Sequence, residues 1–299
     1  MGAAMTTAEV YAASPIKRRR ATKAEMEQRA DFLIEYADEH GPITVRGLYY
    51  QAEVRLIPGI TKNDKDYAKV QHQVLDLRRA GRLSYDTIAD ATRWMRKPTT
   101  HGSIQQCLQD SVRFFRKDLW NDAAEYVEVW CEKDALAGVI YPITSKYDVP
   151  LMVSRGFASE TFCYEAIAQR DGDDRPYYVY YLGDFDRAGL DAARALEEKL
   201  RRFADDDGIE VLFETLAVTE EQISAWGLPT REPKRNSAAD RKWSKAFACE
   251  LDAIPPDDLR DLVEAAINQH LPQRRLEILK IAEESEREIG MRLVGGLTT

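Results

Sequence analysis

The sequence contains few of the residues that mark disulfide-rich, zinc-binding or membrane-spanning proteins. Its 299 residues include four cysteines, Cys107, Cys131, Cys163 and Cys249, and no two of them form a CxxC pair. Cysteines so far apart predict reduced, mostly buried thiols in a cytoplasmic protein, with neither a disulfide framework nor a zinc site. The four histidines are equally scattered. No apolar run approaches the roughly 20 residues that cross a bilayer, and the first residues lack the apolar core of a signal peptide.

The composition is that of an ordinary globular protein, with 44% hydrophobic and 31% charged residues, and the length fits about two domains. A net charge of −9 argues against nucleic acid as a partner, but the charge is unevenly distributed. Residues 1–97 carry 17 Lys and Arg against 13 Asp and Glu, whereas the remainder carries 25 against 38. This asymmetry fits a DNA-contacting module joined to a carboxylate-rich one. Charge alone favours that interpretation no more than a chance asymmetry.

The first third of the chain predicts a disordered basic tail over 1–22 and a small helical domain over 23–97. Apolar periodicity and capping signals predict helices over 23–40, 44–55 and 64–80, followed by a short alternating strand over 82–88. Three helices and a small strand pair are the winged-helix plan, a helix-turn-helix variant that binds double-stranded DNA. Four polar residues of the third helix lie off its apolar stripe and are candidates to face DNA: Lys69, His72, Gln73 and Arg79. The alternative is an ordinary solvent face.

The rest of the chain alternates between short β-rich runs and helical stretches. A linker and helix over 98–123 lead to expected strands at 126–131, 150–154, 177–182 and 209–216. Helices are expected near 103–119, 135–145, 159–169, 188–203, 256–270 and 272–293. Such alternation predicts an α/β fold with a mostly parallel, doubly wound sheet in a domain spanning 124–299, with a helical C-terminal extension.

Carboxylates follow two of these expected strands. Glu132 comes directly after the run YVEVWC, and Asp184 and Asp186 come directly after YYVYYL. Open α/β sheets build their sites at the carboxyl ends of strands, and three carboxylates there can converge on Mg²⁺, or on Mn²⁺ as a substitute. A bound cation would neutralise a phosphate and stabilise a departing oxygen. The alternative for an isolated DxD is a solvated turn or helix cap.

This pattern, Glu132 in EKDA and then GDFDRAG after a hydrophobic strand, resembles the Toprim domain of topoisomerases, primases and some nucleases. The resemblance covers about residues 124–218. It implies that Glu132, Asp184 and Asp186 are Mg²⁺ ligands or catalytic carboxylates. Lys133 is a further candidate because it could meet a phosphate. Arg155, at another strand end, could line the same groove or be a surface residue.

A tyrosine in the segment TVRGLYY carries a second signal. On a helix, Tyr49 shares the apolar face and is expected in the core, whereas Tyr50 lies about 100° further round, one turn after Arg46. A tyrosine hydroxyl can attack a DNA phosphorus, and Arg46 would stabilise the charge on that phosphate. The alternative is that Tyr50 is only an amphipathic surface tyrosine.

TVRGLYY resembles the R-[DE]-[IL]-[FY]-Y motif of the topoisomerase VI A subunit and of its meiotic double-strand-break relative, in which a winged-helix domain precedes a Toprim domain. The match assigns the nucleophile to Tyr50 and retains Arg46, but the acidic position of the motif is Gly47 here. The combined resemblance spans roughly residues 24–290. It also extends to Trp226–Thr230 and Glu250–Ala253, which resemble single-chain bacterial and phage-type relatives without a known role.

The resemblance implies a Mg²⁺-assisted, DNA-cleaving enzyme of the type IIB topoisomerase class. It implies a homodimer in which each Tyr50 cuts one strand, protein-linked 5′ ends, and completion of each tyrosine site by the partner's carboxylates. The chain has no P-loop, so any ATP dependence would come from a separate ATPase subunit. The expected location is cytoplasmic and nucleoid-associated. Two alternatives remain: a Toprim nuclease that hydrolyses DNA without a tyrosine intermediate, and a non-catalytic winged-helix DNA-binding protein.

Overall fold

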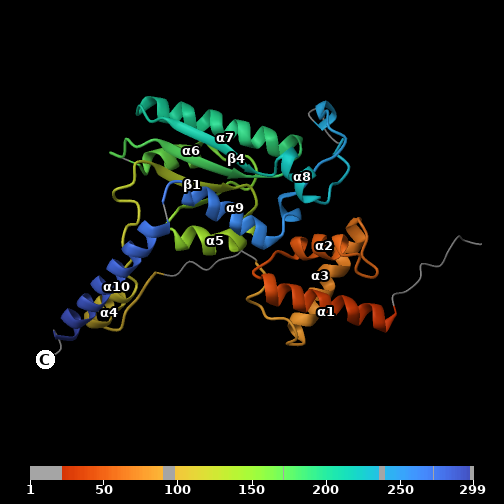
Figure 1. Ribbon diagram of the computed structural model, residues 1–299, viewed down its shortest axis with the longest axis horizontal. Helices are drawn as coiled ribbons and strands as arrows, with labels where there is room; N and C mark the ends of the chain where they lie inside the picture. Colours follow the sequence, from red (N-terminus) through yellow and green to blue (C-terminus); the bar gives the residue numbers. More distant parts are fainter. Residues whose placement is uncertain (1–21, 90–97, 171, 236–239, 272, 297–299) are drawn as a thin grey trace, which may run out of the picture.

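The computed structural model describes residues 22–89, 98–170, 172–235, 240–271 and 273–296. In Figure 1 a group of three helices lies beside a larger α/β part, and a pair of helices extends from the α/β part as an arm. The tail expected to be disordered lies outside the described residues except for Thr22. That residue is ordered, because its hydroxyl oxygen accepts a hydrogen bond from the Glu25 N–H and caps the first helix.

The three expected helices of the first part are confirmed as α1 (Lys23–His40), α2 (Val45–Val54) and α3 (Asp64–Arg79). Each begins after a residue whose side chain accepts a hydrogen bond from the third helical N–H. For α2 that residue is Thr44, as expected from the sequence, and its hydroxyl lies 2.9 Å from the Gly47 nitrogen. The buried residues Val70, Val74 and Leu77 confirm the expected apolar stripe of α3.

The strand expected over 82–88 is not formed. The only pairing there is an isolated bridge between Ile43 and Ile88, which joins this segment to the turn before α2. The connection between α2 and α3 is also longer than the three or four residues of a simple helix-turn-helix. Within 22–89, therefore, three helices are present without the strand pair of a winged helix.

The α/β part has the expected parallel sheet between two helical layers. Its strands are β1 (Tyr126–Cys131), β2 (Leu151–Val153), β3 (Tyr177–Leu182) and β4 (Val211–Ala217), in the spatial order β2-β1-β3-β4 and all parallel. Figure 1 shows α6 (Glu160–Ala168) and α7 (Arg187–Asp206) on one face and α5 (Ala137–Lys146) and α9 (Pro256–Asn268) on the other. The sheet is thus doubly wound.

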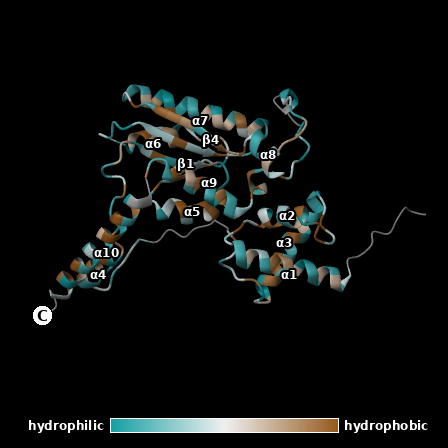
Figure 2. Cartoon of the chain, viewed as in Figure 1, coloured by the Kyte–Doolittle hydropathy of each residue, from teal (hydrophilic) through white to brown (hydrophobic). Residues whose placement is uncertain are grey.

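Alternation along the strands divides the core in two. Val127, Val129 and Cys131 of β1 pack in the cluster that includes α5 and α9, whereas Trp130 packs in the cluster with α6 and α7. Figure 2 shows hydrophilic and hydrophobic residues alternating along α1 and α7, as expected for helices that bury one face. The first cluster also contains residues of α1, α2 and α3, so the three-helix part and the α/β part share one core.

The arm consists of α4 (Ile104–Arg113) and α10 (Gln273–Gly296), which pack against each other (Figure 1). The helix expected over 103–119 ends six residues early. The following segment turns to the main body, where the Trp120 indole N–H donates to the Tyr147 carbonyl oxygen at 2.7 Å. The sequence did not predict the short helix α8 (Glu220–Trp226) or the 3₁₀ turns η1 (Asp134–Leu136), η2 (Asp240–Lys242) and η3 (Leu251–Ala253). None of the helices in the described ranges has the length and apolarity to traverse a bilayer.

Candidate functional site

The strand order places two carboxylates at the point where the chain changes direction across the sheet. From β1 the chain passes to β2 on one side and then to β3 on the other, and such a switch point forms a crevice at the carboxyl ends of the strands. Glu132 follows β1 and Asp184 follows β3. The Asp184 backbone N–H donates to Glu132 Oε2 at 3.0 Å. The structure therefore brings these two expected site residues together.

Glycines make this close approach possible. A Cβ atom on Gly183 would lie 2.8 Å from Glu132 Oε2, and one on Gly189 would lie 2.1 Å from the Asp184 carbonyl oxygen. Glycine is therefore required at both positions, because the turn from β3 into the next helix leaves no room for a side chain.

Burial raises the pKa of both carboxyl groups. For Glu132 the neighbouring Asp184 charge adds to the effect of burial. For Asp184 the positive charge of Lys133 acts in the opposite direction. Two partly buried carboxylates whose charges repel each other favour the binding of a proton or a cation.

Asp186 is directed to other partners. Its Oδ1 accepts a hydrogen bond from the Gly189 N–H at 2.9 Å and caps α7, and its Oδ2 lies 2.8 Å from Arg231 Nη2. In the described part of the chain, no three His, Cys, Asp or Glu side chains are placed to hold a metal ion. The three expected ligands thus form a pair, Glu132 and Asp184, with Asp186 held by an arginine.

Lys133 lies among three carboxylates. Its Nζ is 2.8 Å from Asp184 Oδ1, 2.7 Å from Asp252 Oδ2 and 3.3 Å from Glu250 Oε2. Burial would lower its pKa, but these negative charges outweigh burial and raise it. Lys133 is therefore charged and held by the protein itself, where the sequence suggested a contact to phosphate.

The Glu250–Asp252 segment connects the strand ends to α2. The Leu251 N–H donates to Asp184 Oδ1 at 2.8 Å, and the Thr44 hydroxyl donates to Asp252 Oδ1 at 2.7 Å. Glu250 Oε2 lies 2.5 Å from Arg46 Nη1. The sequence offered this segment only as a family resemblance without a role. The buried pairing with Thr44 and Arg46 has no local sequence signal, because it joins positions more than 200 residues apart.

Tyr50 is buried, which corrects its expected place off the core face. Only 6% of the residue is exposed, because η3 packs on α2. Burial raises its pKa, the Glu250 charge adds to this, and Arg46 and Lys133 oppose it. Tyr50 is therefore a neutral phenol at neutral pH. Tyr49 is buried as expected, and its hydroxyl lies 3.0 Å from the Asn63 nitrogen.

A cleft of about 610 Å³ opens beside Tyr50. Arg46 lines it and lies over the Tyr67 ring, 4.8 Å from the ring centroid. Two cations that the sequence did not single out, Lys62 and Arg231, line it as well. Its other lining residues are Tyr49, Asn63, Asp64, Tyr67, Glu232 and Glu250. Three cations and three carboxylates, Asp64, Glu232 and Glu250, therefore line the cleft beside the buried tyrosine. Arginine and lysine are the side chains that bind phosphate groups.

The candidates on α3 have mixed outcomes. Lys69 pairs with Asp66 at 2.5 Å, and Gln73 donates to the Met26 carbonyl oxygen at 2.8 Å, so both have structural partners. His72 and Arg79 are exposed. Of the four candidates, His72 and Arg79 are the two for which the described residues supply no such partner.

Arg155 lies in the turn after β2 with a positive φ of 54°. Its guanidinium pairs with Asp134 at 2.9 Å, and 61% of its side chain is exposed. The next residue, Gly156, donates its N–H to the Glu132 carbonyl oxygen at 3.2 Å. The turn therefore lies beside the carboxylate pair, while the Arg155 side chain is largely at the surface.

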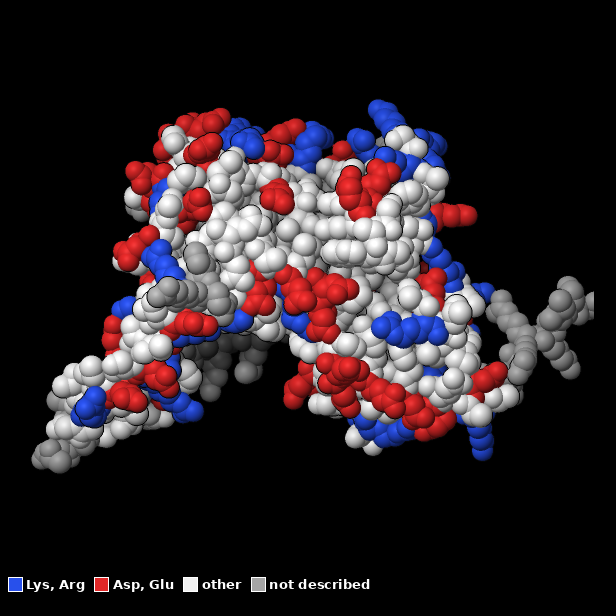
Figure 3. Space-filling view, in the orientation of Figure 1, with Lys and Arg blue, Asp and Glu red and all other residues white. Residues whose placement is uncertain are grey.

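The surface charge indicates which faces a polyanion would avoid. Figure 3 shows Asp and Glu gathered over α1 and in a band along α9, between the two parts of the molecule. In α9 this band includes Asp257, Asp258 and Asp261. These faces would repel a polyanion.

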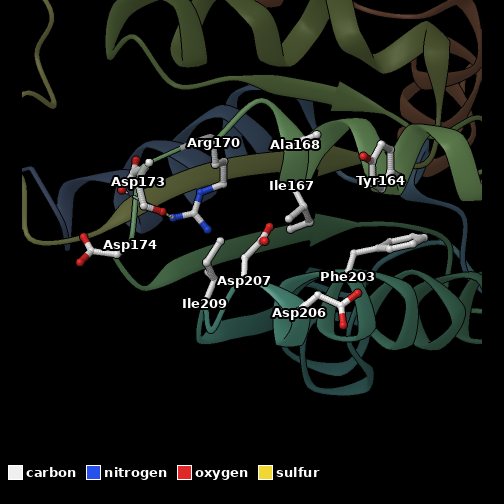
Figure 4. Close-up of a pocket in the computed structure, with 11 residues that line it drawn as sticks. Tyr164, Ile167, Ala168, Arg170, Asp173, Asp174, Phe203, Asp206, Asp207 and Ile209 are labelled. Atoms are coloured by element: carbon white, nitrogen blue, oxygen red, sulfur yellow. Dashed lines mark hydrogen bonds and ion pairs between the residues drawn. The ribbon is translucent and has the colours of Figure 1, made fainter.

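A second hollow, of about 600 Å³, lies at the opposite end of the sheet (Figure 4). Four aspartates line it, and its single lining cation, Arg170, lies between the rings of Tyr126 and Tyr177 at 4.8 Å from each centroid. Figure 4 shows Arg170 directed toward Asp173, with which it forms an ion pair at 3.7 Å. This acidic hollow does not suit a phosphate. The aspartates are Asp173, Asp174, Asp206 and Asp207.

Comparison with known proteins gives no assignment: no protein-family model matches the chain, and no curated protein matches it significantly.

Proposed function

We propose that this protein cleaves DNA by transesterification through Tyr50, with Mg²⁺ assistance, in the manner of a type IIB topoisomerase A subunit. The observation that carries the proposal is the cleft in which Tyr50 lies beside Arg46 and Arg231. Arg231 contacts Asp186 after β3, and Lys133 after β1 binds Asp184, so the cleft is joined to the carboxylate end of the sheet. A nucleophile, phosphate-binding cations and a carboxylate pair are the groups that this chemistry requires.

In the proposed step, Tyr50 Oη attacks the scissile phosphorus. A bond forms between Oη and phosphorus, and the bond from phosphorus to the 3′ oxygen breaks. The phenol proton is lost and the 3′ oxygen gains one, which leaves a 3′ hydroxyl and a 5′ phosphotyrosyl end. Because burial raises the pKa of Tyr50, the proton must leave as the attack proceeds. Arg46 and Arg231 would hold the phosphate and offset its growing charge.

Glu132 and Asp184 are the residues that would hold Mg²⁺, or Mn²⁺ in its place. Their oxygens fit a hard cation that keeps several waters, and burial with like charge nearby raises the pKa of both groups. When bound, such a cation neutralises phosphate charge and stabilises the departing oxygen. Asp186 would join them only after releasing Arg231.

Double-stranded DNA is the proposed substrate, and two copies of the chain would be needed to cut both strands. Strand passage driven by ATP would need a separate ATPase subunit. A protein acting in this way would be found with the cytoplasmic nucleoid.

The test uses supercoiled plasmid with Mg²⁺ or Mn²⁺, quenched with detergent and divided into samples with and without protease. We expect wild-type protein to give cut DNA that carries protein, and protease to release that protein. Tyr50→Phe should abolish the adduct, because the attacking oxygen is gone. Tyr141→Phe is the control, since Tyr141 is 60% exposed on α5, away from the cleft.

Hydrolysis by a Toprim nuclease is the second candidate. The burial of Tyr50 favours it, because a phenol held neutral and 6% exposed is a poor resting nucleophile. Free DNA ends, with cutting retained in Tyr50→Phe, would establish hydrolysis and remove Tyr50 from the mechanism. Salt-dependent binding without any cutting would indicate a non-catalytic DNA-binding protein.

A further inference from the structure

The helix that carries Tyr50 has no room for an acidic residue beside Arg46. Gly47 occupies the position where the resembling motif has Asp or Glu. A Cβ atom there would lie 2.9 Å from Ile43 Cγ1 and 3.3 Å from Thr44 Oγ1. Both neighbours are buried, and Thr44 is fixed by its hydrogen bonds to Gly47 and Asp252. A carboxylate for Arg46 is therefore not available from position 47 of this helix.

Glu250 supplies that carboxylate. Its Oε2 lies 2.5 Å from Arg46 Nη1, and its Oε1 lies 3.2 Å from Arg231 Nε. Both arginines line the cleft beside Tyr50, and Glu250 lines it with them. Only 10% of the Glu250 side chain is exposed, so these ion pairs are poorly screened by water.

A third cation fixes Glu250 from the side of the sheet. Lys133 Nζ lies 3.3 Å from Glu250 Oε2 and 2.8 Å from Asp184 Oδ1. Burial alone would raise the pKa of Glu250, but Lys133, Arg46 and Arg231 outweigh it and lower the pKa to about 2. Glu250 is thus a permanent anion that links the tyrosine helix to the strand ends.

We propose that Glu250 is a positioning residue for the Tyr50 reaction, which holds the Arg46 and Arg231 guanidinium groups at the cleft so that both face the phosphate attacked by Tyr50. The inference rests on the proposed function. It adds a role for the Glu250–Asp252 segment: the carboxylate absent from position 47 of the tyrosine helix is provided by a residue 204 positions from Arg46.

The test compares Glu250→Gln and Glu250→Asp with wild type in single-turnover formation of the DNA adduct. Gln keeps the shape but releases both guanidinium groups, so we expect the rate to fall about 100-fold, as for a displaced catalytic group. Affinity for uncut DNA should stay within about twofold, because the arginines remain cationic. Asp retains the charge and should recover part of the rate. Glu264→Gln is the matched control, since Glu264 pairs with Lys146 outside the cleft.

A second measurement does not depend on cleavage. Replacing Tyr50 with 3-fluorotyrosine makes its ionisation visible by fluorine resonance. Since the Glu250 charge opposes ionisation of Tyr50 more strongly than Arg46 favours it, Glu250→Gln should lower the fluorotyrosine pKa even when Arg46 is released. Glu264→Gln should leave this pKa unchanged. The folded state of each variant is checked by thermal unfolding.

The outcomes separate this inference from the proposed function. An unshifted fluorotyrosine pKa in folded Glu250→Gln would overturn the inference whether or not the protein cuts DNA. A wild-type rate of adduct formation in Glu250→Gln would overturn it while leaving the Tyr50 mechanism intact. If wild type forms no adduct, the proposed function fails, and a shifted pKa would then show only that Glu250 acts on Tyr50.

Discussion

Burial affects the pKa of both Tyr50 and Lys133, but their charged neighbours leave Tyr50 neutral and Lys133 charged. Burial opposes ionisation of each. At Tyr50 the nearby Glu250 charge reinforces burial, whereas at Lys133 three carboxylates overcome it. The site therefore holds a charged lysine and a neutral phenol at neutral pH. In the proposed reaction, the phenol would therefore have to lose its proton as it attacks the phosphate.

The ionisation of Glu250 should make the free energy of unfolding depend on pH between about 2 and 4.5. Its pKa is about 2, against an ordinary value of 4.5. The ionised form therefore stabilises the fold fully above pH 4.5, and this contribution is lost as the pH falls toward 2. We expect the free energy of unfolding of wild type to exceed that of Glu250→Gln by up to about 3 kcal/mol at neutral pH, with the difference shrinking over that range.

Urea unfolding of both proteins at a series of pH values measures this difference. Other carboxylates titrate in the same range in both proteins, so the comparison isolates Glu250. A gap that stays constant from pH 6 to pH 2 would show that Glu250 is not held by its three cations in solution.

At the scale of the elements, α2 depends on close packing at its first turn. We expect Gly47→Ala to lower the free energy of unfolding by about 1–3 kcal/mol, because the added methyl group meets Ile43 and Thr44 in a filled core. This loss should exceed the gain of about 0.5–1 kcal/mol that alanine brings to a helix. Chemical denaturation measures the effect.

Gly295→Ala in α10 is the control, since a Cβ atom there meets nothing within 4 Å. It should cause no loss of stability. If Gly47→Ala were as stable as wild type, α2 would have room for a side chain at this position. Steric crowding would then not explain why position 47 lacks an acidic residue.

Local signals account for the elements that the sequence predicted well. The cap at Thr44 marks the start of α2, and the apolar runs of β1 and β3 coincide with the strands residue for residue. The strand expected over 82–88 failed because alternation alone does not supply a pairing partner, and Ile88 makes a single bridge with Ile43. Short elements such as η3 have too few residues for a periodic signal.

Only the part of the site that lies at the strand ends could be predicted from the sequence. Glu132 and Asp184 follow recognisable strands and meet at the switch point, as expected. Helical periodicity placed Tyr50 outside the core because the apolar stripe reports only one packing face. Its burial comes from η3, and the partners of Arg46 and Asp186 come from Glu250 and Arg231. These contacts join distant segments, which a local pattern cannot detect.

At the scale of the whole molecule, side-chain contacts join α2, the helix that carries Tyr50, to the strand ends of the sheet in the same chain. The resemblance implied that a partner's carboxylates complete each tyrosine site. Here Thr44 and Arg46 bind Asp252 and Glu250 of the same chain, and these in turn bind Lys133. Reaching a partner's strand ends would require these buried contacts to break, which is costly when charged partners are left unpaired.

A mixture of two inactive variants distinguishes a site built within one chain from a site shared between two chains. If each site is built within one chain, a mixture of Tyr50→Phe with Asp184→Asn should give no nicked plasmid, because no chain has both groups. If sites form across a dimer, each mixed dimer would have one intact site, and nicks would appear. Exchange of subunits between the variants, shown by differently tagged chains that copurify, makes the negative result meaningful.

The long separation between Arg46 and Glu250 also sets an order of events during synthesis. A ribosome that adds roughly 5–20 residues per second needs on the order of ten to forty seconds to make the 204 residues from Arg46 to Glu250. Until then α2 lacks the packing of η3, and Arg46 lacks its ion pair with Glu250. A chain that is truncated before Glu250 carries Tyr50 but not the Glu250–Asp252 segment that packs on its helix. The cleft therefore cannot assemble until the ribosome has passed Glu250.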